Sequence, residues 1–288
     1  MKTAKIHFFD TVPGVTFLSI GLNVLLLLIN GGICAVLLSL GSLEPNEMTL
    51  LVYALFVSYW IITTVLILAI PRDRFILKKI VPGGGNTGKN FLMGLFFGFL
   101  MNGFCIAVAA IRGDVFFTRG NTKLGFMLTA FICVLIQSAA EEYVNRVYLY
   151  QRLKRGYPEK PWIPVLFTAI CFSLAQMGNR GMTWVSYSMI FLIGLLFALV
   201  IHFFDSAWMV FGLHTAWNYT QSIIFGLPNS GIVTPCSLLQ LEGSVAEKTV
   251  AYDPVFGIEG TYLALSVAAL AIVVTLYIGN KRKLKIKI

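Results

Sequence analysis

Long apolar segments are the feature that most restricts what this chain can fold into. A helix needs about 20 mostly apolar residues to cross the hydrocarbon core of a bilayer. We therefore expect an all-α fold, a polytopic membrane protein with about eight transmembrane helices that form a single integral membrane domain over residues 1–288. The eight segments that meet or approach the required length are 16–40, 48–70, 90–111, 124–150, 162–178, 184–203, 206–226 and 260–279.

The composition agrees with this fold class. Hydrophobic residues make up 57% of the chain and charged residues 12%, which is about half of the charged share of an average soluble domain. The chain has too few polar groups to cover its whole surface. Part of that surface therefore has to face lipid. The five cysteines show no CxxC spacing and four lie within apolar runs, so we expect no disulfide framework.

The placement of lysine and arginine predicts the orientation, because short cytoplasmic loops are enriched in these residues. The net charge of +9 therefore reflects topology, and we expect no nucleic acid as a partner. Loop 112–123 fits less well, since it holds three basic residues. We expect a multi-pass protein of the cell membrane with both termini cytoplasmic. The residues that carry this expectation are Lys2, Lys5, Arg72, Arg74, Lys78, Lys79, Lys89, Arg152, Lys154, Arg155, Lys160, Lys281, Arg282, Lys283, Lys285 and Lys287.

Ionisable side chains inside the fourth apolar segment are candidates for a functional site, because burying them in a membrane is costly. Glu142 and Arg146 are four residues apart, a helical spacing that allows an ion pair. Glu141 points about 100° away from Glu142, and it shares its own face with Gln137 and Asn145. One glutamate is therefore neutralised, whereas the other is left available for chemistry.

Two further segments carry polar residues at a similar depth. His214 and Asn218 share one face of the seventh segment, and Gln176 lies near the end of the fifth. Counted at 1.5 Å per residue from the cytoplasmic ends of their helices, these residues and Glu141 lie roughly 12–21 Å into the membrane. We expect the three helices to bring these groups together in a buried cavity.

The same residues resemble the motifs of one family, the CAAX prenyl protease type 2 and bacteriocin-processing (CPBP) intramembrane proteases. "EEYVNR" (141–146) fits EExxxR, "HTAWN" (214–218) fits HxxxN, and "FSLAQ" (172–176) stands in the place of FxxxH. Beyond this core, "FGIEG" (256–260) resembles a loop-end sequence of bacterial relatives. The resemblance covers about residues 90–226, and it implies eight membrane helices around a cavity open to the cytoplasm.

The resemblance also implies an intramembrane endopeptidase, with membrane lipids around it and a peptide or membrane-anchored protein as its substrate. Amide hydrolysis needs a base that activates water and donors that stabilise the developing oxyanion. In this interpretation Glu141 is the base, and His214 and Asn218 polarise the scissile carbonyl. Glu142 with Arg146 holds the helix and the first glutamate in place.

Gln176 leaves a second interpretation open, because the family usually has histidine at this position. A glutamine amide can donate a hydrogen bond, but it cannot transfer a proton as histidine can. The alternative function is a catalytically silent member that binds peptides or acts as an immunity or scaffold protein. With Gln176, the cavity offers His214 and a glutamate, one ligand short of a catalytic zinc site, so we expect no metal and no other cofactor. A transporter is disfavoured, since the sequence shows neither inverted halves nor paired broken helices.

Overall fold

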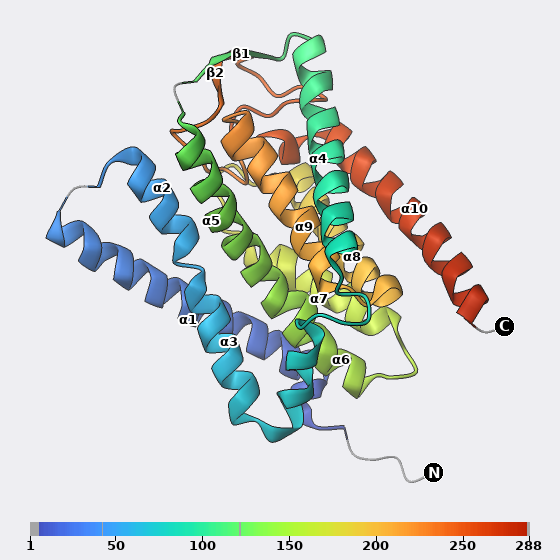
Figure 1. The fold of residues 1–288 in the computed structure, drawn as a ribbon. Helices are drawn as coiled ribbons and strands as arrows, with labels where there is room; N and C mark the ends of the chain where they lie inside the picture. Colours follow the sequence, from blue (N-terminus) through green and yellow to red (C-terminus); the bar gives the residue numbers. More distant parts are fainter. Residues whose placement is uncertain (1–5, 42, 121, 287–288) are drawn as a thin grey trace.

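The structure is a computed structural model, and it describes residues 6–41, 43–120 and 122–286. Lys2, Lys5 and the side chains of residues 282–288, which contribute to the orientation prediction, lie outside this description. Helices dominate the described part of the chain (Figure 1). They are α1 (Val12–Leu40), α2 (Pro45–Ala54), α3 (Val57–Ala69), α4 (Gly88–Ile111), α5 (Leu124–Glu142), α6 (Tyr150–Gly156), α7 (Trp162–Ala175), α8 (Trp184–Phe204), α9 (Ala207–Asn218) and α10 (Tyr262–Ile286).

The helices confirm the expected fold class of a multi-pass membrane protein. By length and composition, six helical stretches of the described residues can cross a membrane, whereas α7 is a shorter apolar helix. The count of eight spans is therefore approximate. The six stretches are Val12–Ser39, Pro45–Ala69, Gly88–Ile111, Leu124–Gly156, Trp184–Phe204 and Tyr262–Lys281.

The second expected segment, 48–70, is bent rather than straight. The chain turns at Leu55 and Phe56, between α2 and α3. There the amides of Phe56 and Ser58 donate to carbonyls three residues back, at 3.3 and 3.0 Å. Such bonds tighten the local turn relative to an α-helix, and α2 therefore leans away from the line of α3 (Figure 1).

Helix α9 lies at the centre of the bundle, directly against α4. A Cβ atom on Gly94 of α4 would lie 2.1 Å from the carbonyl oxygen of Met209, and one on Gly212 of α9 would lie 2.4 Å from that of Phe91. Only glycine fits at these positions, since small residues let two membrane helices approach closely. This contact fixes the height and rotation of α9, and with them the residues that follow Gly212.

A buried ionic cluster holds one end of the bundle together. We call this end of the bundle the basic end. It joins the 3₁₀ segments Phe8–Asp10 and Pro71–Lys79 to α6. Arg152 pairs with Asp73, and Nη2 of Arg155 lies 2.6 Å from Oδ1 of Asp10. The end of the second 3₁₀ segment reaches the end of α8 here, where Nζ of Lys79 lies 2.9 Å from Oδ1 of Asp205. This end lies at the bottom of Figure 1.

The opposite end, which we call the sheet end, carries a two-stranded sheet that the sequence does not predict. Strand β1 (Val115–Arg119) pairs antiparallel with β2 (Leu239–Ser244), across the top of Figure 1. In the loop before β1, Nε of Arg112 lies 3.1 Å from Oδ2 of Asp114. One of the three basic residues that fit the topology poorly is thus paired with a local acid.

Candidate active site

A cavity of about 760 Å³ lies between α1, α2, α5, α7, α8 and α9. Four of the residues predicted from sequence line it, namely Glu141, Gln176, His214 and Asn218. The three helices that carry them therefore meet at one site, as the depth argument predicts. The remaining two predicted residues, Glu142 and Arg146, are fully buried beside the cavity.

Glu142 is the anchor of the site. Nε of Arg146 lies 3.2 Å from its Oε2 atom, which confirms the predicted pair within α5 and the segment after it. Nδ1 of His214 lies 3.0 Å from its Oε1 atom, a link to α9 that the sequence does not reveal. The Arg146 guanidinium also donates to the carbonyl of Gly194 at 3.2 Å and stacks 4.2 Å from the ring centre of Phe172. Through Arg146 and His214, the Glu142 carboxylate thus links α5 to α7, α8 and α9.

Glu141 is placed differently from its neighbour, because it is half-buried and faces the cavity. Nε2 of Gln137 donates to its Oε1 atom at 2.7 Å. Nδ2 of Asn145 donates to its main-chain carbonyl at 2.8 Å. The face that the helical spacing predicts for Glu141 is therefore confirmed, with both predicted neighbours in contact.

Asn218 belongs to a chain of amides that ends at Glu141. Its Nδ2 atom donates to Oε1 of Gln137 and to Oγ of Ser138, both at 3.2 Å. Its Oδ1 atom accepts from Nδ2 of Asn229, again at 3.2 Å. Successive hydrogen bonds that point the same way polarise one another, so this chain directs donors toward the Glu141 carboxylate. In this arrangement the Asn218 amide nitrogen is engaged by Gln137 and Ser138 of α5.

Gln176 lies at the C-terminal cap of α7, and its side chain is half-buried at the cavity wall. Its Oε1 atom accepts a hydrogen bond of 2.8 Å from Nδ2 of Asn179. The acceptor end of the amide is thus engaged by a neighbour, and the donor end, Nε2, is the group that Gln176 can offer to a ligand.

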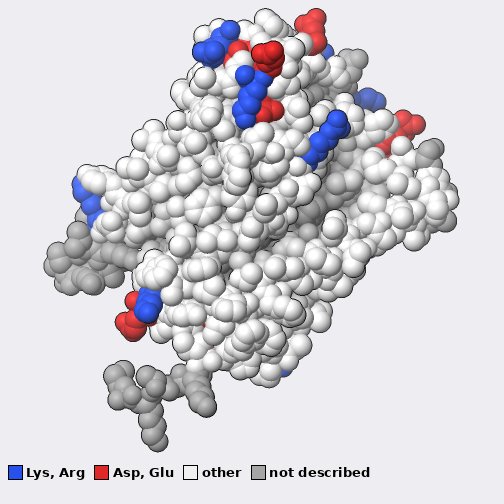
Figure 2. All heavy atoms as spheres, turned by 180° about the vertical axis from the view of Figure 1, so that it is seen from behind, with Lys and Arg blue, Asp and Glu red and all other residues white. Residues whose placement is uncertain are grey.

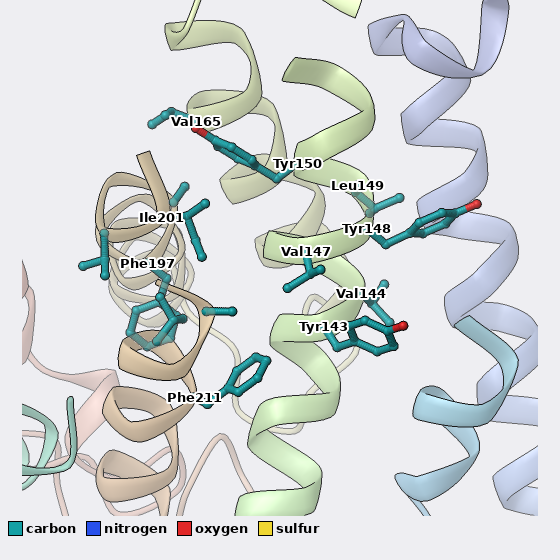
Figure 3. Close-up of a cluster of buried hydrophobic side chains, with 14 of the residues drawn as sticks. Tyr143, Val144, Val147, Tyr148, Leu149, Tyr150, Val165, Phe197, Ile201 and Phe211 are labelled. Carbon is teal, nitrogen blue, oxygen red and sulfur yellow. The ribbon is translucent and has the colours of Figure 1, made fainter. Parts of the chain in front are cut away.

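Two π-helical segments begin directly after motif residues. Tyr143–Leu149 follows Glu142, and Tyr219–Ile224 follows Asn218. Such wide turns are rare and occur often at functional sites. Side chains of the first segment and of α6 pack on different sides, as Figure 3 shows for Tyr148 of the segment and Tyr150 at the start of α6. The motif spacing gives no signal of these turns.

Glu259 is a site residue that sequence reasoning missed. It lies in the 3₁₀ turn before α10, lines the cavity and is 8% exposed. Its Oε1 atom accepts from Nε1 of Trp217 at 3.0 Å, and its Oε2 atom accepts from N and Oγ of Ser230 at 2.9 and 2.6 Å. Burial raises the pKa of Glu259 above its ordinary value, in spite of these hydrogen bonds.

The backbone around Glu259 supports the same contact. Gly257 has a φ of 83°, and a Cβ atom there would lie 1.8 Å from the carbonyl oxygen of Pro228. The turn that carries Glu259 thus packs directly on the connection that carries Asn229 and Ser230. The only signal in the sequence was the "FGIEG" stretch, and its glutamate could not be linked to α9 without the fold.

The cavity opens at the sheet end of the bundle and between helices, not at the basic end. All twelve residues from 142 to 153 are buried, so the bundle is closed between the site and the ionic cluster. The cavity lining instead extends to Val52 of α2 and to Ile232 and Val233, which are 41%, 64% and 62% exposed. Figure 2 shows the surface hollowed between the α1–α2 lobe and the rest of the molecule.

This geometry bears on two expectations taken together. The resemblance implies a cavity open to the cytoplasm, and the lysine and arginine bias assigns the basic loops to the cytoplasm. In the structure the opening and the basic loops lie at different ends of the bundle, since the buried stretch 142–153 separates them. The two expectations therefore do not hold together in this fold.

The donor groups of the site are few. Among the described residues, no three His, Cys, Asp or Glu side chains are grouped as a metal ion would need. Of the side chains that could bind a metal, Glu142 and His214 lie side by side, with His214 at one oxygen of the Glu142 carboxylate. Arg146 lies at the other oxygen of that carboxylate. The expectation of a metal-free site stays a prediction.

Comparison with known proteins agrees with the motif assignment. Residues 123–220 match the family model described as "Rce1-like: Type II CAAX prenyl endopeptidase Rce1-like". The matched residues include Glu141, Glu142, Gln176, His214 and Asn218. No curated protein and no solved structure matches the chain. The family match confirms the resemblance over residues 123–220, which are about a third of the chain.

Proposed function

We propose that the chain is an intramembrane endopeptidase of the CAAX and bacteriocin-processing type, in which Glu141 activates water for attack on a peptide bond. The observation that carries this proposal is the different placement of the two adjacent glutamates. Glu142 is held by Arg146 and His214, whereas Glu141 faces a cavity with room for a peptide segment. A carboxylate that faces such a cavity is a suitable general base.

The proposed reaction uses groups that line the cavity. A water molecule gives a proton to the Glu141 carboxylate while its oxygen bonds to the scissile carbonyl carbon. The carbonyl oxygen becomes an oxyanion, which hydrogen-bond donors stabilise. The C–N bond then breaks, and the proton held by Glu141 moves to the leaving amine. No covalent enzyme intermediate is needed.

His214 and Gln176 are the donors that we propose for the oxyanion. When both ring nitrogens carry hydrogen, His214 donates from Nδ1 to Glu142 and presents Nε2 to the cavity. Gln176 presents its Nε2 atom, since its Oε1 atom accepts from Asn179. For Asn218 we propose a positioning role through Gln137, because its amide hydrogens point toward α5.

A peptide library tests the proposal. The purified protein in detergent should cut at least one peptide, and Glu141→Ala should abolish that cleavage. Glu159→Ala is the matched control, because Glu159 is exposed at the basic end and its loss should leave cleavage unchanged. Cleavage that persists in Glu141→Ala would contradict the proposed base.

The second candidate function is a silent member that binds peptides, or serves as an immunity or scaffold protein. Gln176 favours it, since an amide cannot replace histidine in proton transfer. This candidate predicts that library peptides bind the wild type and Glu141→Ala with similar affinity, and that neither protein cuts them.

We further propose the cell membrane as the location, with both termini in the cytoplasm. The support is the basic end, where Arg72, Arg152 and Arg155 meet Asp10 and Asp73. Lipids that surround the helices and a peptide or membrane-anchored protein are the proposed partners.

A further inference from the structure

The two ends of the bundle differ in charge. Nine lysines and arginines lie in residues 71–89 and 152–160, which belong to the basic end. The connections of the sheet end, 112–123, 176–183 and 227–259, carry five between them. Two of these five are paired with local acids, Arg112 with Asp114 and Lys248 with Asp253.

The surface between the two ends carries little charge. In Figure 2 most of the visible charged side chains lie toward the sheet end, a smaller group lies toward the basic end, and the band of surface between them carries few charged atoms. Such a band is the part of the surface that lipid covers, and the end richer in lysine and arginine faces the cytoplasm. The basic end is therefore the cytoplasmic one, and the sheet end faces the other side of the membrane.

From this sidedness and the opening of the cavity, we propose that the site takes its peptide from the extracytoplasmic side of the membrane. The path from the cytoplasm is closed by the buried residues 142–153 and by the ionic cluster beneath them. The path from the sheet end is lined by the exposed residues Ile232 and Val233.

The walls of the cavity indicate the kind of peptide. Near the opening they are apolar, with Leu27 of α1, Val52 of α2 and Val233 of the connection after α9. Farther in, the polar groups of the proposed active site begin. The substrate that fits is a peptide segment that emerges from the outer leaflet, with an apolar anchor against the α1–α2 lobe. This inference rests on the proposed function for the nature of the ligand, and on the charge distribution for the side.

Cysteine accessibility in spheroplasts tests the side without any assay of activity. The variants are Val233→Cys at the opening and Lys78→Cys at the basic end, each in a chain whose five native cysteines are replaced by serine. A membrane-impermeant maleimide should modify Val233→Cys in intact spheroplasts and Lys78→Cys only after detergent lysis. If cells do not produce the chain without native cysteines, the same two substitutions are made in the wild-type chain. The maleimide labelling of each variant is then compared with that of the wild type.

Labelling of Lys78→Cys in intact spheroplasts, or of Val233→Cys only after lysis, overturns the proposal. A second arm uses a membrane-impermeant peptide that the purified protein cuts. Right-side-out vesicles should cut this peptide, whereas inverted vesicles should not, and the reverse result also overturns the proposal. If the labelling is as expected and the purified protein cuts no peptide, the proposed activity fails while the sidedness stands.

Discussion

Nδ1 of His214 lies 3.0 Å from Oε1 of Glu142, the second glutamate of the adjacent pair, and Arg146 approaches the other oxygen of that carboxylate at 3.2 Å. The histidine of the HxxxN motif is therefore tied to the glutamate that is fully buried. The neighbouring Glu141 keeps its place at the cavity. The two adjacent glutamates look equivalent in the sequence but have different surroundings. Glu142 is buried among charged partners, whereas Glu141 faces the cavity.

This difference predicts unequal effects of two conservative substitutions on stability. Glu142→Gln should lower the free energy of unfolding by about 3–5 kcal/mol, because it leaves the buried Arg146 without its partner. Glu141→Gln should change that energy by less than about 1 kcal/mol, since the new amide oxygen can still accept from Gln137. Denaturant unfolding in detergent measures both, and equal losses would show that Glu142 is not the anchor.

Gln176 separates the active from the silent interpretation. If its Nε2 atom donates to the oxyanion, Gln176→Ala should lose about 10²–10³ in rate, and Gln176→His should change the rate modestly. If proton transfer is needed at this position, the wild type should be nearly inert and Gln176→His should gain about 10²-fold or more. If Gln176 is structural, Gln176→Ala should lower thermal stability and leave turnover per folded molecule unchanged. We expect the first result, measured with a peptide that the wild type cuts.

The donor groups of the site predict that activity does not depend on zinc. Cleavage should survive treatment with chelators, and elemental analysis of the purified protein should find no stoichiometric zinc. The physical reason is the ligand set, because His214 and one glutamate fall short of a catalytic zinc site. About one zinc per chain, lost on His214→Ala, would contradict this expectation.

Glu259 predicts a pH dependence of stability. Burial raises its pKa in the folded chain, so folding favours the protonated carboxyl. Its contribution is fully present below the ordinary glutamate pKa of about 4.3, and it is lost as the pH rises through the raised value. Glu259→Gln, which cannot ionise, should therefore show a flatter profile of unfolding free energy against pH. The measurement is denaturant unfolding over a pH series in detergent, and two parallel profiles would contradict the assignment.

Local spacing predicts the parts of the molecule that depend on one helix. The apolar segments give the helices, and the four-residue spacing gives the Glu142–Arg146 pair. The face of Glu141, with Gln137 and Asn145, follows from the same geometry. These features need only the rise and rotation of a helix, which is why a single sequence contains them.

Features that depend on contacts between distant segments were not predictable in the same way. The link from Glu142 to His214 spans 72 residues, and that from Trp217 to Glu259 spans 42. No periodicity encodes such pairs. The end of the bundle at which the cavity opens was not predictable either, because it depends on how α1 and α2 lie against α7 and α8. The π-helical turns after Glu142 and Asn218 were not predicted for a further reason, because the motif patterns assume a regular α-helix.

In the proposed reaction, Glu141 activates water for cleavage of a peptide bond. The most direct measurement follows one peptide in water enriched with heavy oxygen, in parallel for the wild type and Glu141→Gln. We predict that the wild type produces a fragment whose new C-terminal carboxylate contains one heavy oxygen atom. We predict that Glu141→Gln, folded to the same extent, produces that fragment at least about 10²-fold more slowly. An equal rate in the two proteins, or no fragment from the wild type on any peptide tested, would contradict the account.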